Sequence, residues 1–450
     1  MRLRNNALLK TLCFDITALL ALATAPAPLV NAQTETTLYT FTGNEDGANP
    51  SGALVGDSNG NYFGTNFAGG LIGGNCHSIG CGNVFELSPD GHGGWTEKSI
   101  YDFTGGPDGA EPVAGVIFDE SGNLYGTAEA GGYTGNSRCG SGVAPGCGVV
   151  FKLSPTLSGT WTETTLYQFK GRLDGYLPTT RLAFDGSGNL YGTANLGGPR
   201  NVGGVFQLSP NGSGGYTFKG IHPFTNGPDG GRAWDITIDA GGTLYVATSQ
   251  GGITGGLCGG SAGCGAVIAL SSNGSGFVQH VVHDFTGHGD GSGPAGLTVD
   301  AQGNVFGVTQ FGGDKNCLHG FGCGTVFEFS PVAGGGWLGH VIYQFHNTGD
   351  GLDPVYSPTL DAAGNLYGAF SSAAQGCPSN CGGIYKLSPV TGGWSETVLY
   401  NFTAGADGWE PNAPTLDNAG NLFGTTLVGG DGTSCIPDPN GCGIAFEIAP

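Results

Sequence analysis

Residues 100–127, IYDFTGGPDGAEPVAGVIFDESGNLYGT, contain a motif that recurs seven times along this 450-residue chain. A hydrophobic-aromatic-x-Phe run is followed by Asp-Gly, then by Asp-x-x-Gly-Asn and Leu-Tyr-Gly-Thr. The Phe of the motif recurs in steps of 55 to 66 residues, at Phe41, Phe103, Phe169, Phe224, Phe285, Phe345 and Phe402. Self-similarity at a fixed period indicates a repeat architecture, and here the repeats cover the chain from residue 35 to residue 450.

Each repeat contains four runs of strand length. In the first complete example they span residues 116–118, 123–127, 149–153 and 161–169, and the third run alternates apolar and polar residues. Asp-x-x-Gly-Asn predicts a tight hairpin in which the Asp side chain caps the turn and Gly takes a positive φ. Seven four-stranded units are typical of β-propeller blades. A solenoid is the alternative, but its end repeats would need polar capping variants, and none is present.

The two outermost runs predict a closed ring. Residues 36–41 match the fourth strand of a repeat without the first three, and residues 444–448 match a third strand without a fourth. Pairing them would complete the last blade and remove both sheet edges. We therefore predict an all-β, seven-bladed β-propeller whose N-terminal strand completes the last blade. The predicted repeats span about 35–97, 98–163, 164–218, 219–279, 280–339, 340–396 and 397–450.

Residues 1–32 have the pattern of a signal peptide. Arg2, Arg4 and Lys10 form a basic start, residues 16–29 are mostly apolar, and Val-Asn-Ala at 30–32 fits a cleavage site. We expect residues 33–450 to be secreted as the propeller domain. A formal net charge of −21 disfavours nucleic acid and anionic membranes as partners. No second apolar stretch is long enough to span a membrane, and we expect a monomer.

Apart from Cys13, the twelve cysteines form six close pairs in the loops between second and third strands. An even number in an exported chain predicts disulfides. No single loop supplies a full zinc ligand set. The predicted bonds are Cys76–Cys81, Cys139–Cys147, Cys258–Cys264, Cys317–Cys323, Cys377–Cys381 and Cys435–Cys442.

These motifs together resemble the GloVer tandem-repeat family of exported bacterial proteins. The best copies are residues 100–155 and 399–430, and the resemblance extends over residues 34–450. It implies an extracytoplasmic bacterial protein but brings no activity or catalytic residues with it. Members often carry a C-terminal surface anchor. Because this sequence ends at Pro450 inside its last repeat, we expect release rather than anchoring.

In a propeller of this topology, the Asp-Gly loops and the cysteine loops share one face, and long loops on a rigid scaffold often carry function. The repeated aspartates could form a calcium ring, but turn capping by each Asp is the favoured interpretation. No cofactor is predicted. The aspartates are Asp46, Asp108, Asp174, Asp229, Asp290, Asp350 and Asp407.

Departures from the repeat consensus suggest a ligand site on this loop-rich rim. Tyr176 and Trp409 follow Asp-Gly where other repeats have small or aliphatic residues, and repeat four replaces the Pro region with Arg-Ala-Trp-Asp. Aromatic rings beside Arg and acidic groups suit carbohydrate, whose C–H faces stack and whose hydroxyls need donors and acceptors. The candidate ligand-binding residues are Tyr176, Trp409, Glu410, Arg172, Arg232, Trp234 and Asp235.

Three histidines in rim loops, His288, His319 and His346, could form a metal or acid–base cluster, although scattered surface histidines are the favoured interpretation. The leading functional hypothesis is an exported binding propeller, with a glycan as ligand or an extracellular protein as partner. The alternatives are a polysaccharide hydrolase or lyase and a structural extracellular scaffold. The near-uniform repetition of the acids disfavours catalysis, which needs unlike groups converging on one substrate.

Overall fold

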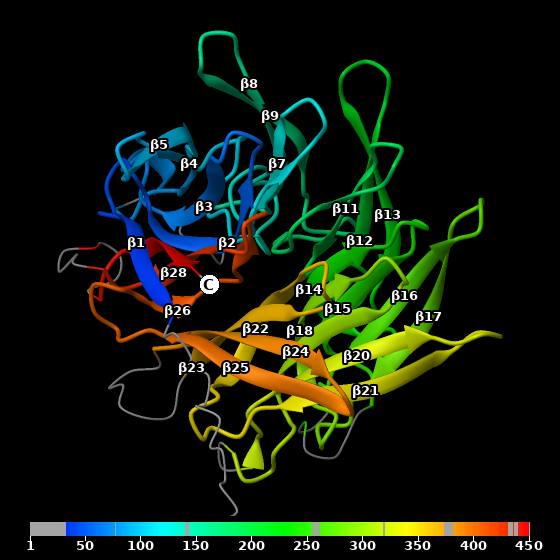
Figure 1. Cartoon of the computed structure of the whole chain (residues 1–450). Coiled ribbons are helices and arrows are strands. Elements are labelled where there is room, and N and C mark those ends of the chain that lie inside the picture. The colour runs from blue at the N-terminus through cyan, green and yellow to red at the C-terminus, as the bar shows by residue number, and fades with distance from the viewer. Residues whose placement is uncertain are drawn as a thin grey trace, which may run out of the picture. The chain divides into compact units, whose positions relative to one another are not determined.

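The computed structural model describes residues 33–76, 78–139, 144–253, 258, 262–317, 320–372, 381–430, 435 and 440–449. They form seven antiparallel sheets, one per repeat, arranged as the blades of a β-propeller (Figure 1). The predicted fold class is confirmed. Within the described residues, none of the segments is an apolar helix of bilayer-spanning length.

The strands follow one another through each blade from the inner to the outer edge. Blade 1 has β2 (Ala48–Gly56), β3 (Tyr62–Ala68), β4 (Asn83–Pro89) and β5 (Trp95–Asp102), with a short 3₁₀ helix, η1 (Gly74–Cys76), between β3 and β4. Blade 2 has β6 (Ile117–Phe118), β7 (Leu124–Ala128), β8 (Val149–Pro155) and β9 (Trp161–Gln168). Blade 3 has β10 (Ala183–Phe184), β11 (Leu190–Ala194), β12 (Gly204–Pro210) and β13 (Tyr216–Pro223). Blade 4 has β14 (Gly231–Ile238), β15 (Leu244–Gln250), β16 (Ala266–Ser272) and β17 (Phe277–Asp284).

The remaining blades follow the same order, and the inner strand of the last one is divided in two. Blade 5 has β18 (Ser292–Val299), β19 (Val305–Phe311), β20 (Thr325–Pro331) and β21 (Trp337–Gln344). Blade 6 has β22 (Leu352–Leu360), β23 (Leu366–Ser372), β24 (Gly383–Val390) and β25 (Gly393–Asn401). Blade 7 has β26 (Trp409–Pro411), β27 (Thr415–Leu416), β28 (Leu422–Val428), β29 (Ile444–Ala449) and β1 (Thr34–Thr40).

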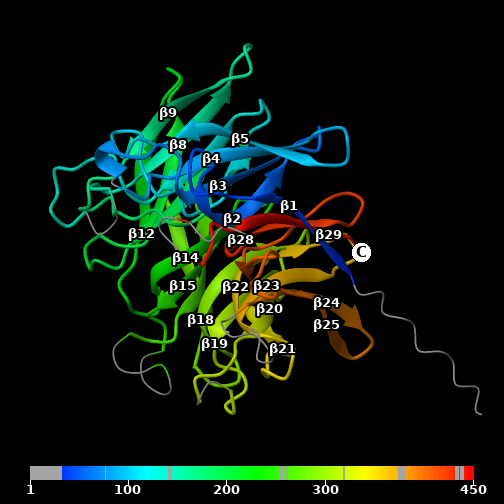
Figure 2. The ribbon, with the colours of Figure 1, turned by 90° about the vertical axis from the view of Figure 1, so that its left-hand side faces the viewer.

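The ring closes through β1, as the two outermost runs predict. β1 pairs antiparallel with β29, from Thr34 opposite Ala449 to Thr40 opposite Ile444. The two strands lie side by side although they come from opposite ends of the propeller sequence (Figure 2). The pairing covers the edge of β29, so β1 becomes the outer strand of blade 7 and one sheet contains both ends of the propeller sequence.

The repeated Phe forms the core of each blade. Phe103 is fully buried, and its ring meets Phe151 edge-to-face with 5.1 Å between centroids. Gly126 lies under that ring, where a Cβ would come within 2.5 Å of Phe151 Cζ. In blade 4 Val246 replaces this glycine and pairs with Ile268 instead of an aromatic residue, so the two changes compensate in volume.

The disulfides staple the loops between second and third strands. Five of the six predicted bonds are present among the described residues: Cys76–Cys81, Cys139–Cys147, Cys258–Cys264, Cys317–Cys323 and Cys435–Cys442. Cys381 is disulfide-bonded as well, while Cys377 lies outside the described residues. These bonds are typical of an oxidising, extracellular compartment.

Candidate functional site

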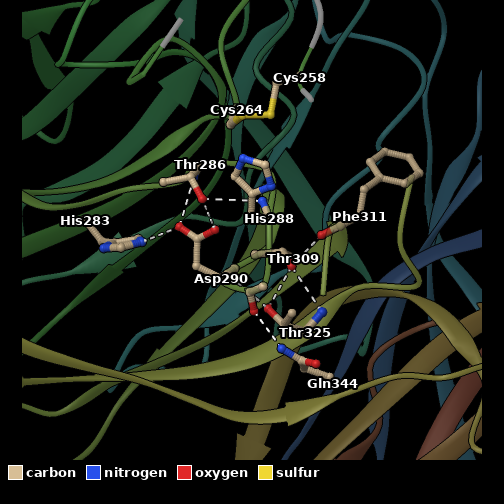
Figure 3. Close-up of polar contacts among 11 residues, drawn as sticks. Cys258, Cys264, His283, Thr286, His288, Asp290, Thr309, Phe311, Thr325 and Gln344 are labelled. Atoms are coloured by element: carbon tan, nitrogen blue, oxygen red, sulfur yellow. Dashed lines mark hydrogen bonds and ion pairs between the residues drawn. A yellow bond between two sulfur atoms is a disulfide. The ribbon is translucent and has the colours of Figure 1, made fainter. Parts of the chain in front are cut away.

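The Asp-Gly turns are held by their own aspartates. In blade 5, Asp290 accepts hydrogen bonds from the Thr286 hydroxyl and backbone N–H, the latter at 2.9 Å, and His283 Nε2 lies 3.1 Å from the same carboxylate (Figure 3). In blade 2 the equivalent partner of Asp108 is the Tyr101 hydroxyl, at 3.0 Å. Each of these carboxylates is satisfied within its own loop, so it caps a turn.

Three residues after each of these aspartates, the chain adopts a left-handed conformation. The φ angles are 55° at Asn49, 57° at Glu111, 55° at Leu177, 52° at Arg232, 62° at Gly293, 57° at Asp353 and 53° at Glu410. Six of these seven residues are not glycine, although a non-glycine residue in this region costs about 1–3 kcal/mol. The surrounding structure must therefore impose the conformation.

Hydrogen bonds between blades impose it. The N–H of each left-handed residue donates to a carbonyl of the preceding blade; for example, Glu111 donates to Cys81 at 2.8 Å and Asp353 to Cys323 at 2.9 Å. In six blade junctions that carbonyl belongs to the second cysteine of a pair, and in the cysteine-free blade 3 it belongs to Val202. The stapled loop of one blade thus fixes the point where the inner strand of the next blade begins.

The inner strands of all seven blades enclose an axial channel with a volume of about 980 Å³. Small and aliphatic residues, such as Ala53, Val113 and Ala413, form much of its wall. A few polar and aromatic side chains interrupt this wall, and unlike the Asp-Gly turns they differ from blade to blade. Such a cavity, mostly apolar with a few polar groups, is the usual form of a small-ligand site.

Asp235 of β14 joins three blades at the channel wall. Its Oδ2 atom accepts hydrogen bonds from the Leu297 N–H in blade 5 at 2.8 Å and from the Ser357 hydroxyl in blade 6 at 2.5 Å. Burial raises the pKa of Asp235, against the opposing effects of the Ser357 hydrogen bond and the Arg181 charge. This carboxylate holds β18 and β22 in place beside its own strand.

Two aromatic residues line the channel next to this junction. Trp234, which precedes Asp235, is 49% exposed, and Tyr356, which precedes Ser357, is 36% exposed and has a φ of 65°. Arg181 of blade 3 also lines the channel and is exposed. Among the described residues, no acidic group forms an ion pair with Arg181.

A pair of glutamates lies at the blade 2 side of the channel. Glu129 lines the cavity and hydrogen-bonds to Glu111, which is 1% exposed. Burial, with the charge of Glu111, raises the pKa of Glu129 to about 7. The Ala144 N–H donates to Glu111 at 3.2 Å, so the inner partner is also held from the stapled loop of the same blade.

Comparison with protein families identifies the repeat. Residues 257–437 match the model of the Gloeobacter/Verrucomicrobia repeat. This match supports the resemblance to the GloVer repeat family that the sequence motifs indicate. The matched segment covers the repeats of blades 5 and 6 and parts of those of blades 4 and 7, and the motifs of the other blades have the same order and spacing. No curated protein sequence matches this chain.

Solved structures resemble the chain in fold alone. The extracellular domain of a B. thetaiotaomicron hybrid two-component system aligns at 13% identity with a TM-score of 0.51, over 92% of this chain and 39% of that one. A second such domain from the same organism aligns at 14% identity and a TM-score of 0.50, over 92% and 41%. A Bacteroides uniformis protein named as a 6-phosphogluconolactonase aligns at 14% identity and a TM-score of 0.48, over 77% and 83%.

The structure places the candidate ligand-binding residues in different settings. Trp234 and Asp235 line the channel, and Arg232 and Glu410 hold the left-handed positions at the start of inner strands. Arg172 is exposed in the loop before blade 3. Tyr176 is part of a hydrophobic core cluster, and Trp409 packs against another such cluster.

The expectation that Tyr176 presents its ring to solvent is wrong. Tyr176 is 6% exposed and packs against Cys139 and Cys147 of the preceding blade. Trp409 is partly buried at the equivalent position, against Cys381 and a neighbouring core. At these two positions the larger side chain therefore adds to the hydrophobic core.

Two of the three rim histidines, His288 and His346, lie among the described residues. Within the described residues, no group of three or more His, Cys, Asp or Glu side chains could hold a metal ion. His346 Nδ1 lies 3.4 Å from Asp350 of its own loop, and the His288 N–H donates to Thr286. His319 lies outside the described residues.

Sequence inspection did not single out Glu129, Tyr356 or Arg181 as channel residues. All three depart from the residue type found at the same repeat position in other blades, where Phe67, Gly296 and Ala53 are examples of what stands instead. That deviation was the available signal. The repeat pattern alone does not show that these three positions border the channel.

Proposed function

We propose that the protein is exported and binds a saccharide in its axial channel. The observation that carries the proposal is Trp234, an indole that is 49% exposed while it lines a cavity. A large aromatic side chain in a monomeric propeller is normally buried between strands, as Phe103 and Phe151 are. Leaving an indole half in water loses hydrophobic stabilisation that a bound apolar face would restore.

The groups around Trp234 match the chemistry of a sugar. Sugar rings present C–H faces that stack on aromatic rings, and hydroxyls that both donate and accept hydrogen bonds. Arg181 supplies donors only, Glu129 can donate or accept, and Asn195 offers both in its amide. The channel volume of about 980 Å³ lies at the upper end of the range for ligand pockets, which suits an oligosaccharide segment.

Export is supported by the disulfides and by the signal-peptide pattern of residues 1–32. An extracellular protein meets polysaccharides as soluble chains and at surfaces. The stapled loops would then keep the channel preformed, because they fix the start of each inner strand without ligand.

A glycan array with the purified protein tests the proposal, followed by titration calorimetry on the best hit. We expect Trp234→Ala to weaken binding at least tenfold without lowering the melting temperature. Phe321→Ala is the matched control, since Phe321 is 69% exposed and lies outside the channel lining. Retention of binding in Trp234→Ala, or its loss in Phe321→Ala, would place the ligand elsewhere.

A polysaccharide hydrolase or lyase is the second candidate, and Glu129 favours it. A channel-lining carboxyl with a pKa of about 7 is partly protonated at neutral pH, as a general acid or base requires. Glu129 hydrogen-bonds to the buried Glu111, and this pair could exchange one proton with a bound substrate.

Product analysis separates the two candidates. An enzyme would release new reducing ends or unsaturated products from the glycan that it binds, and Glu129→Gln would abolish this release while binding persists. A binding protein would leave the glycan intact, whether Glu129 is present or not.

A further inference from the structure

We infer that the bound saccharide is anionic, carrying carboxylate or sulfate groups, and that Arg181 binds the anion. The inference rests on the proposed saccharide site and adds the chemical class of its ligand. It begins from Arg181, which lines the axial channel and forms no ion pair with any described residue.

The backbone beside Arg181 is fixed on both sides. Thr180 is 2% exposed; its hydroxyl accepts hydrogen bonds from the Thr193 N–H and hydroxyl, both at 3.2 Å. Its carbonyl accepts from the Thr127 hydroxyl of blade 2 at 3.2 Å. Arg181 therefore extends from an anchored segment, and its guanidinium lines the channel in an exposed position.

The acidic side chains that line the channel have partners of their own, and Glu129 hydrogen-bonds to Glu111. The charge of Arg181 favours a lower pKa of Asp235, against the effect of burial. The Oδ2 atom of Asp235 already accepts hydrogen bonds from the Leu297 N–H and the Ser357 hydroxyl. Asp300, which also lines the channel, accepts from the Gln302 N–H at 2.9 Å and from Asn304 at 2.8 Å and 2.7 Å in its own turn. Within the described part of the chain no ion pair involves Arg181, so its five N–H donors can serve a ligand.

Basic residues are few in this chain, and part of them belong to blades 3 and 4. The chain carries 14 basic against 35 acidic residues, yet several of the basic ones belong to the loops and inner strands of blades 3 and 4. They are Lys170, Arg172, Arg181, Arg200 and Arg232. A planar guanidinium binds carboxylate or sulfate oxygens in bidentate fashion, whereas the acidic remainder of the surface repels them.

Trp234 defines how such a ligand would lie. It lines the same channel one residue from Asp235, whose carboxylate is within electrostatic reach of Arg181. A uronic acid ring could stack its C–H face on the indole while its carboxylate meets the guanidinium. A neutral sugar could use the indole but would leave the charge of Arg181 without a partner.

Matched trisaccharides test the inference by calorimetry on the full mature chain: trigalacturonate, galactotriose as its neutral counterpart, and a sulfated galactotriose. We expect one or both anionic probes to bind at least tenfold more tightly than galactotriose. Arg181→Gln should reduce the affinity for the anionic probes to that for galactotriose and so remove the preference, while Arg200→Gln, an exposed arginine outside the channel lining, should behave as wild type.

The outcomes distinguish this inference from the proposed function. Equal affinity for charged and neutral probes, with loss of both in Trp234→Ala, would overturn the anion and keep the saccharide site. An anionic preference that Arg181→Gln does not alter would also overturn it. Absence of binding by every trisaccharide and by the glycan array would overturn both proposals.

Discussion

Asp235→Ala should destabilise the propeller through one channel-wall carboxylate. The side chain accepts hydrogen bonds from the buried Leu297 N–H and from Ser357, on two other blades. An unsatisfied buried donor costs about 1–3 kcal/mol, so the substitution should cost about 2–6 kcal/mol. Unfolding entropy near 2.1 cal/mol/K per residue corresponds to about 0.9 kcal/mol/K for the propeller, and the melting temperature should fall by about 2–7 °C.

Scanning calorimetry on the wild type and on three variants checks this value. Asp235→Asn keeps an acceptor oxygen and should lose less than half as much as Asp235→Ala. Asp90→Ala, which removes the cap of an exposed hairpin, should change the melting temperature little because its donors return to water. A shift below 1 °C in Asp235→Ala would refute the argument that this carboxylate holds three blades together.

Three further predictions concern the rest of the ring. Burial raises the pKa of Glu97 from the ordinary value of about 4.5 to about 8. The folded state therefore binds the proton of Glu97 more tightly than the unfolded state does. Because of this difference, the free energy of unfolding should decrease as pH rises from about 4.5 to about 8. The melting temperature should be higher at pH 5 than at pH 8, and Glu97→Gln should flatten the profile; an increase toward pH 8 would contradict the sign. The glutamates whose pKa is raised to about 7 act in the same direction: Glu129, Glu163 and Glu396. Replacing Cys139 and Cys147 together by Ser should cost about 2.5 kcal/mol in urea unfolding, from the loop entropy of an eight-residue separation, and no change in the midpoint would refute a stabilising role. Deleting β1 (Thr34–Thr40) should expose the edge of β29 and cause concentration-dependent association in light scattering, whereas a stable monomer would show that closure is dispensable.

The fold was predictable because each of its devices repeats seven times. The Phe, the Asp-Gly turn and the Asp-x-x-Gly-Asn hairpin occur at fixed spacing, so an error in one repeat is corrected by the others. The length of the first strand of each blade was not predictable in the same way. In blades 2 and 3 it is only two residues long, whereas in blades 1, 4, 5 and 6 it has eight or nine residues.

The candidate site was predictable only in part, because it depends on what does not repeat. Trp234 and Asp235 were identified as deviations from the consensus, and they line the channel. Tyr176 is also a deviation, yet its position faces the adjacent blade, where it is buried. Sequence shows that a residue differs but not which way it faces, and the left-handed start of the inner strand makes alternation an unsafe guide.

A crystal structure of the protein with its best glycan-array hit tests the central claim most directly. We predict saccharide density inside the axial channel, with a sugar ring stacked on Trp234 and an anionic group at Arg181. Density confined to the loop-rich rim or to the outer strands, with the channel filled by water alone, would contradict it.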